Sequence, residues 1–155
     1  MYHKLISIVL LALLFNGCDK TIVNEYHKME NNYWLYSEPF SATFEIQDTS
    51  IRYNIYFTIK HSNDYPKENI YIRITDDFSG STNIDTVNID LSDEYGIWKG
   101  NGSYQDYEYE ALLHKNYKFN NPQKYNIKFE QFTRSDTLGG VNEVGFELRK
   151  ASINK

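Results

Sequence analysis

A strict alternation of apolar and polar side chains is the feature that most limits how this chain can fold. The clearest example is residues 51–60, where alternate positions are apolar: Ile51, Tyr53, Ile55, Phe57 and Ile59. Successive side chains of a β-strand point to opposite faces, so a period of two gives a strand one buried and one exposed face. The pattern therefore predicts a strand that covers a core with one side.

Six further segments show the same period of two. They are residues 40–46, 70–74, 87–91, 107–119, 125–129 and 144–148. Polar and turn-forming residues in 61–69 interrupt the alternation, and a hairpin between strands 51–60 and 70–74 fits this arrangement. Residues 107–119 fit either one long strand or two short ones, with a single helical turn around 111–114 as the competing interpretation.

The sequence predicts an all-β fold, an antiparallel β-sandwich of about seven or eight strands in residues 36–155. Turn signals separate the strands at Ser79-Gly80, Asn121-Pro122 and Gly139-Gly140, and no long amphipathic helix is evident. Short alternating strands between turns are typical of two antiparallel sheets packed face to face. Aromatic residues make up 16% of the chain, which supplies a large core without disulfides.

Residues 1–17 have the layout of a signal peptide. A short segment with one positive charge, Lys4, precedes an apolar run over 5–15, and Asn16-Gly17 then leads to Cys18. The apolar run is too short to cross a bilayer, because a membrane-spanning helix needs about 20 apolar residues. We expect cleavage before Cys18.

Cys18 is the only cysteine, so it cannot form a disulfide within the chain. Its place at the end of the signal predicts a bacterial lipoprotein in which acyl chains such as palmitate are attached to Cys18. Each buried CH₂ contributes roughly 0.8 kcal/mol to membrane binding, and two or three chains hold a protein stably. The open alternatives are an uncleaved apolar anchor and a conventionally secreted protein.

Residues 18–35 are expected to be the lipidated N-terminus and a tether. The segment is polar and irregular, and a flexible chain of this length spans roughly 20–25 Å. Ile22, Val23, Tyr26 and Met29 recur at nearly helical spacing. A short helix that docks on the domain is therefore the alternative.

The charge of the chain argues against nucleic acid as a partner. The formal net charge is −5 at pH 7, and removal of residues 1–17 with Lys4 makes it −6. An acidic protein of this kind repels nucleic acid and anionic lipid headgroups. We therefore expect the acyl group, and not a basic patch, to be the anchor to the lipid bilayer.

No motif indicates catalysis, a metal or a cofactor. The four histidines, His3, His27, His61 and His114, have no partners at metal-ligand spacing. The chain has no glycine-rich phosphate loop and no serine in a strand-to-helix elbow. The acidic pairs Asp76-Asp77 and Asp93-Glu94 lack the spacing of a calcium-binding loop, and solvated turn carboxylates are the simpler interpretation. The prediction is a protein that is not an enzyme.

The most distinctive loop is residues 96–102, in which three glycines surround Trp98. Glycine permits positive φ or close backbone approach. Trp98 either folds back to cap the sandwich, which we favour, or contacts a partner or ligand. Tyr104 and Tyr107 lie nearby and could form a platform that binds a sugar or a protein. An envelope protein that binds a ligand or glycan is accordingly the alternative function.

The chain resembles the gliding-motility lipoprotein family of Bacteroidetes called GldH. The residues that carry the resemblance are Cys18-Asp19-Lys20, Tyr26, Trp34, Phe44-Glu45-Ile46, Asp48-Thr49, Tyr53-Asn54-Ile55, Asn63-Asp64-Tyr65-Pro66, Asn69, Gly96-Ile97-Trp98-Lys99-Gly100, Gly102, and the segments 125–131 and 140–146. They extend over nearly the whole chain.

The resemblance implies an accessory, non-catalytic component of the gliding motility and type IX secretion machinery. It implies protein partners in that apparatus and a location in the cell envelope, on the outer membrane facing the periplasm. The family supplies no catalytic residues to carry over to this chain.

Overall fold

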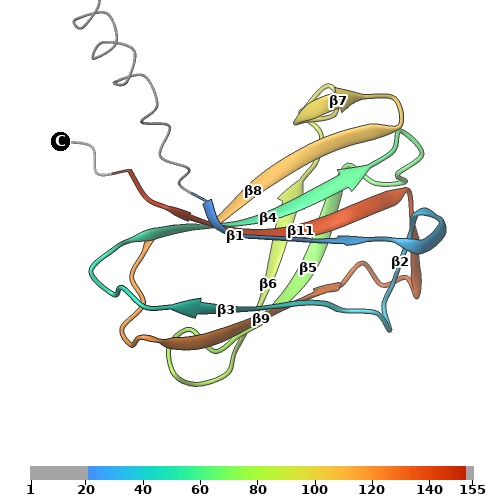
Figure 1. Ribbon diagram of the computed structural model, residues 1–155. Helices are drawn as coiled ribbons and strands as arrows, with labels where there is room; N and C mark the ends of the chain where they lie inside the picture. The colour runs from blue at the N-terminus through green and yellow to red at the C-terminus, as the bar shows by residue number, and fades with distance from the viewer. Residues whose placement is uncertain (1–20, 153–155) are drawn as a thin grey trace, which may run out of the picture.

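The computed structural model describes residues 21–152, which form two facing antiparallel sheets (Figure 1). The first sheet has the order β1-β11-β4-β8-β7, with β1 at Thr21–Lys28, β11 at Val141–Lys150, β4 at Tyr53–His61, β8 at Asp106–Tyr117 and β7 at Asn101–Ser103. The second has the order β3-β9-β5-β6, with β3 at Phe40–Ile46, β9 at Gln123–Gln131, β5 at Asn69–Asp76 and β6 at Asn83–Asp90. A small pair joins β2, Tyr33–Leu35, to β10, Thr137–Gly139. The 3-10 turn η2 covers Glu30–Asn32.

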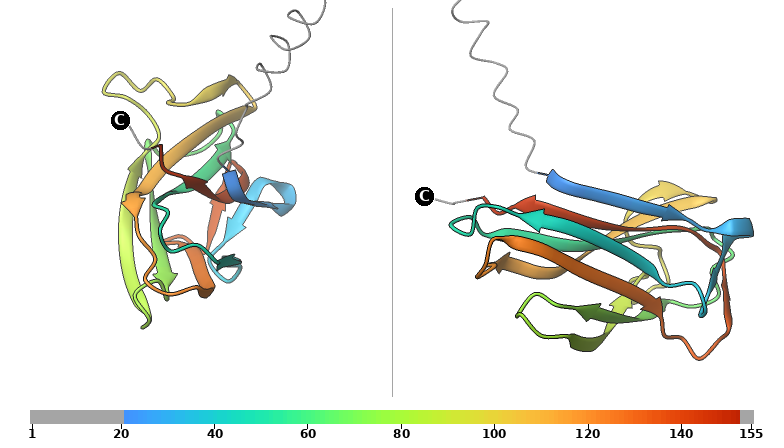
Figure 2. Two further views of the ribbon diagram at one scale, coloured as in Figure 1. Left: turned by 60° about the vertical axis from the view of Figure 1, so that its left-hand side comes forward. Right: turned by 60° about the horizontal axis from the view of Figure 1, so that its bottom comes forward.

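The alternating residues form the core between the sheets. In β4, Ile55, Phe57 and Ile59 are completely buried. Aromatic rings connect the layers: the centroids of Phe57 and Phe129 are 5.1 Å apart. This arrangement confirms the predicted antiparallel sandwich, and the two layers are visible edge-on in Figure 2.

The described residues form eleven strands, more than the predicted seven or eight. Three of them, β2, β7 and β10, have only three residues each and are too short to show a periodic pattern. Residues 106–117 form the single long strand β8, without a helical turn. Its pairing with β4 is irregular near Ile55, and Asn116 has a positive φ of 56°.

The predicted hairpin between 51–60 and 70–74 is wrong, because β4 and β5 lie in different sheets. β4 pairs with β11 and β8, whereas β5 pairs with β6 and β9. The connection between them therefore crosses from one sheet to the other. Hydrophobic alternation identifies a strand and its buried face, but it does not identify the neighbouring strand.

The tether expected over 18–35 differs from the structure, which includes most of this segment in the sandwich. Residues Thr21–Lys28 form the edge strand β1, which pairs with β11, and β2 and η2 follow. The alternative of a short docking helix differs from the structure too, because residues 21–35 form β1, the 3-10 turn η2 and β2. Tyr26 lies opposite Gly145 in β11, and the lack of a side chain there leaves space for the tyrosine ring. The predicted signal peptide and Cys18 lie outside the described residues.

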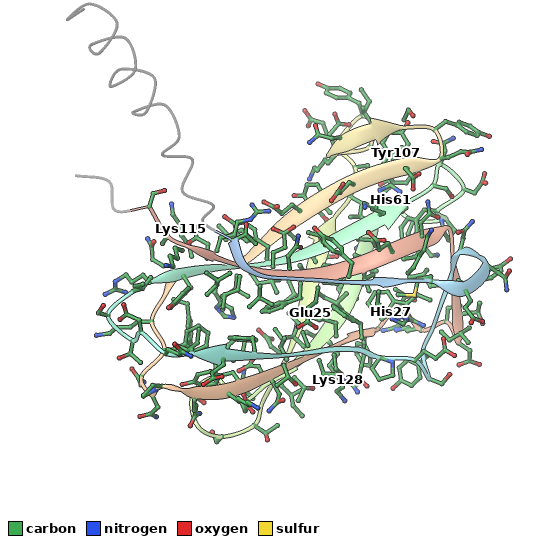
Figure 3. All side chains as sticks on the ribbon, viewed as in Figure 1. Glu25, His27, His61, Tyr107, Lys115 and Lys128 are labelled. Carbon is green, nitrogen blue, oxygen red and sulfur yellow. The ribbon has the colours of Figure 1, made fainter. Side chains whose placement is uncertain are left out.

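The two ends of the sandwich are distinct. The anchor end consists of residues 47–52, 115–124 and 150, next to the start of β1, because Thr21 pairs with Arg149 and Tyr53 with both Lys150 and Tyr117. The far end consists of residues 62–69, 91–106 and 131–140. Figure 3 shows Lys115 near the start of β1, and His61 and Tyr107 at the opposite end of the same sheet. Within 21–152, no helix is long and apolar enough to cross a membrane.

Candidate functional site

Four rings at the far end form what we call the Trp98 cluster: His61, Tyr65, Trp98 and Tyr107. The His61 ring lies at its centre, 4.7 Å from Trp98, 5.4 Å from Tyr65 and 5.7 Å from Tyr107 between centroids. His61 ends β4, and Tyr107 faces it from the start of β8 (Figure 3). The rings hold together the end of the first sheet and the two loops beside it.

The loop over 91–100 positions Trp98. Asp93 Oδ1 accepts hydrogen bonds from the backbone N–H groups of Tyr95 and Ile97, each at 2.9 Å. Gly100 has a φ of +91° and packs so closely against the Glu108 carbonyl that a Cβ there would lie 2.1 Å from its oxygen. The loop therefore needs glycine at this position, both for the backbone conformation and for the close approach.

Trp98 is half-buried and folds back onto the sandwich. Its indole N–H donates a 2.8 Å hydrogen bond to Asn63 Oδ1 in the loop after β4. The ring meets His61 edge to face, an arrangement favoured by aromatic pairs. This placement agrees with the capping role expected from the sequence.

His61 is completely buried, and burial lowers the pKa of its imidazole. Its Nδ1 is 3.1 Å from the Ser62 carbonyl oxygen, and its Nε2 has no hydrogen-bond partner. The low pKa follows because a charged imidazolium would lose its hydration among the surrounding rings. The neutral ring is part of the packing, and its hydrogen-bonding contact within residues 21–152 is the Ser62 carbonyl.

The structure brings together two of the three predicted contact residues. Trp98 and Tyr107 have centroids 6.3 Å apart. Tyr104 stays apart with 63% of its surface exposed, and its carbonyl accepts a 2.9 Å hydrogen bond from the Asn63 N–H. Sequence reasoning missed His61 and Tyr65 as members. For His61 a signal existed, since it continues the alternation of the apolar positions in β4.

Two of the grooves beside the described part of the sandwich are lined partly by apolar side chains. One, of about 290 Å³, lies between β6 of the second sheet and β8 of the first. Its lining includes the half-buried side chains of Val87, Tyr109 and Leu113. The other is larger, about 980 Å³, and is lined in part by the exposed rings of Tyr71 and Phe132. Both are partly open to solvent, and the smaller one is also lined by charged side chains, among them Asp85, Asp90 and Lys99.

The acidic pairs serve the turns in which they lie. Asp76 accepts hydrogen bonds from the Phe78 N–H and the Asn83 side chain, and Asp77 accepts two from Asn126. Among residues 21–152, no three His, Cys, Asp or Glu side chains are grouped closely enough to hold a metal ion.

The fold and its surface thus define a small antiparallel β-sandwich domain whose far end is closed by an aromatic cluster. The family model of the GldH lipoprotein matches residues 21–148, which include nearly all of the sandwich. The chain belongs to the GldH lipoprotein family.

Two relatives match along almost their whole length. The gliding motility lipoprotein GldH of Flavobacterium johnsoniae is 24% identical over 151 residues, covering 92% of this chain and 94% of the relative. The GldH homolog of Christiangramia forsetii, also described as a gliding motility lipoprotein, is 25% identical over 152 residues, covering 92% and 93%.

Solved structures with a related shape are more distant. A carbohydrate-binding module specific for non-crystalline cellulose has a TM-score of 0.47 and 11% identity, covering 83% of this chain and 73% of that one. A second module, solved with a disaccharide that contains glucuronic acid, has a TM-score of 0.35 and 13% identity, covering 90% and 96%. Similarity at this level does not indicate a shared ligand.

Proposed function

We propose that this protein is a non-catalytic accessory component of the gliding motility and type IX secretion machinery, attached by acyl chains on Cys18 to the outer membrane and facing the periplasm. The observation that carries the proposal is the family match over residues 21–148, together with full-length relatives described as gliding motility lipoproteins. The protein would act by binding other proteins of the apparatus.

The paired polar groups of the sandwich serve its own structure. His61 is enclosed by rings, and its nearest polar partner is a backbone carbonyl. The ion pairs on the outer face of the first sheet join β4 to β11 through Lys60–Glu143 and β8 to β11 through Arg149–Glu110. These groups stabilise strand pairing, and none of them presents a nucleophile beside a base.

Complementation of a deletion strain of the native organism tests both the machinery and the anchor. We expect deletion to abolish gliding where the organism glides, and to reduce type IX secretion. The wild-type gene should restore both, and Cys18→Ala should restore neither, because the unacylated protein leaves the membrane. Colony spreading, secreted protein profiles and membrane fractionation are the readouts.

A matched variant separates loss of the anchor from loss of the fold. Ile84→Ala changes an exposed side chain on β6, away from the far end, and keeps Cys18, so it should be made, acylated and retained in the membrane and should restore gliding and secretion. The proposal is contradicted if the Cys18→Ala protein, present at normal levels and free of the membrane, supports full secretion and gliding.

A further inference from the structure

We propose that the anchor end of the sandwich lies on the membrane surface with its basic side chains against anionic lipid headgroups, while the far end points away from the bilayer. The inference rests on the proposed acylation of Cys18. It concerns which surface of the domain meets the lipid and which surface remains available to partners.

The first observation is the short link between Cys18 and the folded domain. β1 begins at Thr21, three residues after Cys18. A fully extended chain covers at most about 3.6 Å per residue, so this link reaches no more than about 11 Å. The start of β1 must therefore stay close to the membrane if Cys18 carries the lipid.

The second observation is the length of the domain compared with that link. β4 and β11 have nine and ten residues, and a strand rises about 3.3 Å per residue, which gives roughly 30 Å from end to end. Because Thr21 pairs with Arg149 near the end of β11, only the anchor end is within reach of the bilayer when the strands stand upright.

The third observation is the distribution of charge between the ends. The anchor end presents five exposed basic side chains: Arg52, Lys115, Lys118, Lys124 and Lys150. The acids around it are Glu45, Asp48, Asp76 and Asp77, which are fewer than the bases. Asp76 is buried, and Asp48 and Asp77 accept hydrogen bonds from Ser50 and Asn126. A cluster with more basic than acidic groups is attracted to an anionic bilayer over about one Debye length.

The far end has the opposite balance. Its acidic side chains are Asp64, Glu68, Asp93, Glu94, Asp106 and Asp136, against Lys67, Lys99 and Arg134. An anionic surface repels this end, so electrostatics and the short link favour the same orientation. The orientation refines the expectation from net charge alone: the protein is acidic as a whole, but the end next to the lipid is basic. It also turns the exposed Tyr104 and the half-buried Trp98 toward the compartment.

Single-cysteine labelling of the lipidated protein in vesicles measures the orientation. Cys18 is the only native cysteine and is consumed by acylation, so a new cysteine takes a single fluorophore. We would label Asn120→Cys at the anchor end and Ile97→Cys at the far end, both exposed positions. The vesicles contain phosphatidylethanolamine and phosphatidylglycerol, with a nitroxide quencher on a fraction of the headgroups.

We expect strong quenching of the label at 120 and little quenching at 97. Charge reversal of Lys115, Lys118 and Lys124 to Glu should reduce quenching at 120 at least twofold, and high salt should have a similar effect on the unreversed protein. Reversal of Lys67, Lys99 and Arg134 is the matched control and should leave quenching at 120 unchanged. Equal quenching at both positions, stronger quenching at 97, or no difference between the two reversals overturns the orientation.

The same samples distinguish this failure from failure of the proposed anchor. Intact-mass measurement and vesicle flotation report whether Cys18 is acylated and the protein is membrane-bound. An acylated, floating protein with the wrong quenching pattern overturns the orientation alone. A protein without lipid on Cys18 overturns the anchor and, with it, the orientation.

Discussion

At the scale of single residues, Gly145 is the position that lets β1 join the sheet. A Cβ there would lie 2.4 Å from both Thr58 Oγ1 and Tyr26 Cδ1. Overpacking of this kind costs about 1–3 kcal/mol, so we predict that Gly145→Ala lowers the free energy of unfolding by that amount. Gly139→Ala is the control, because its Cβ would meet the half-exposed ring of Tyr33 at 3.2 Å, which can move. Urea unfolding should show a loss of stability for Gly145→Ala and little change for Gly139→Ala. Equal stability of Gly145→Ala and wild type would contradict the close packing of Tyr26 and Thr58 on Gly145.

His61 makes the stability of the domain depend on pH. Its pKa in the folded state lies below the ordinary value of 6.5, so folding favours the neutral ring. Its contribution is present above pH 6.5 and is lost as the pH falls below 6.5, where the unfolded chain takes up a proton first. We predict a smaller loss of stability between pH 7.5 and 5.5 for His61→Phe than for wild type, measured by urea unfolding.

The exposed His114 provides the control for that comparison. His114→Asn should retain the loss of stability seen in wild type over the same pH interval. A His61→Phe protein with the same pH dependence as wild type would show that His61 does not carry the effect.

Truncation of Trp98 should lower the stability of the domain much more than truncation of Tyr104. Trp98 packs against His61 and donates a hydrogen bond to Asn63, so Trp98→Ala should destabilise the domain by about 2 kcal/mol. Tyr104 is 63% exposed, and Tyr104→Ala should change stability by less than about 0.5 kcal/mol. Thermal melts followed by circular dichroism can measure both. A Trp98→Ala protein with unchanged stability would favour a contact role over capping.

At the scale of elements, β1 is an integral strand. It covers the edge of β11, and Val23 packs against the core. We predict that a chain beginning at Thr21 folds cooperatively, whereas one beginning at Met29 loses at least about 3 kcal/mol or aggregates, because the edge of β11 is then open. A stable, soluble chain from Met29 would show that the segment is dispensable, as a tether would be.

The strands that alternate most clearly were predictable from sequence, and β1 was not. In β3 every second residue is buried, from Phe40 to Ile46, so the period of two is strong. In β1 no residue is fully buried, whereas β3, which is also an edge strand, buries one whole face in the core. The apolar residues of β1 are consequently few, and Ile22, Val23, Tyr26 and Met29 happen to match a helical spacing. An alternating pattern in the sequence reveals a strand only where one face is buried, and β1 buries little of either face.

The Trp98 cluster shows the same limit for the candidate site. Trp98 was recognisable as a loop residue with neighbouring glycines, and the folded-back geometry agrees with that interpretation. Its central partner His61 lies 37 residues earlier, and its contact depends on the crossing of β4 to the other sheet, where a hairpin had been expected. Periodicity carries no information on such long-range pairing.

At the scale of the whole molecule, the proposals assign different roles to the two ends of the sandwich. The start of β1, at the anchor end, is within about 11 Å of the proposed lipid on Cys18, and the far end presents the exposed Tyr104 beside the half-buried Trp98. In the proposed orientation, a protein partner bound at the far end would be held away from the membrane by the length of the sandwich, roughly 30 Å.

The most direct test of the central claim is photo-crosslinking in living cells of the native organism, with a photoreactive amino acid at Tyr104 or, as the control, at Asn120. The captured proteins are purified through this chain and identified by mass spectrometry. The account predicts that position 104 captures a component of the gliding or type IX secretion machinery and that position 120 does not. Recovery of only abundant outer-membrane proteins or glycan-uptake components from position 104 would contradict it.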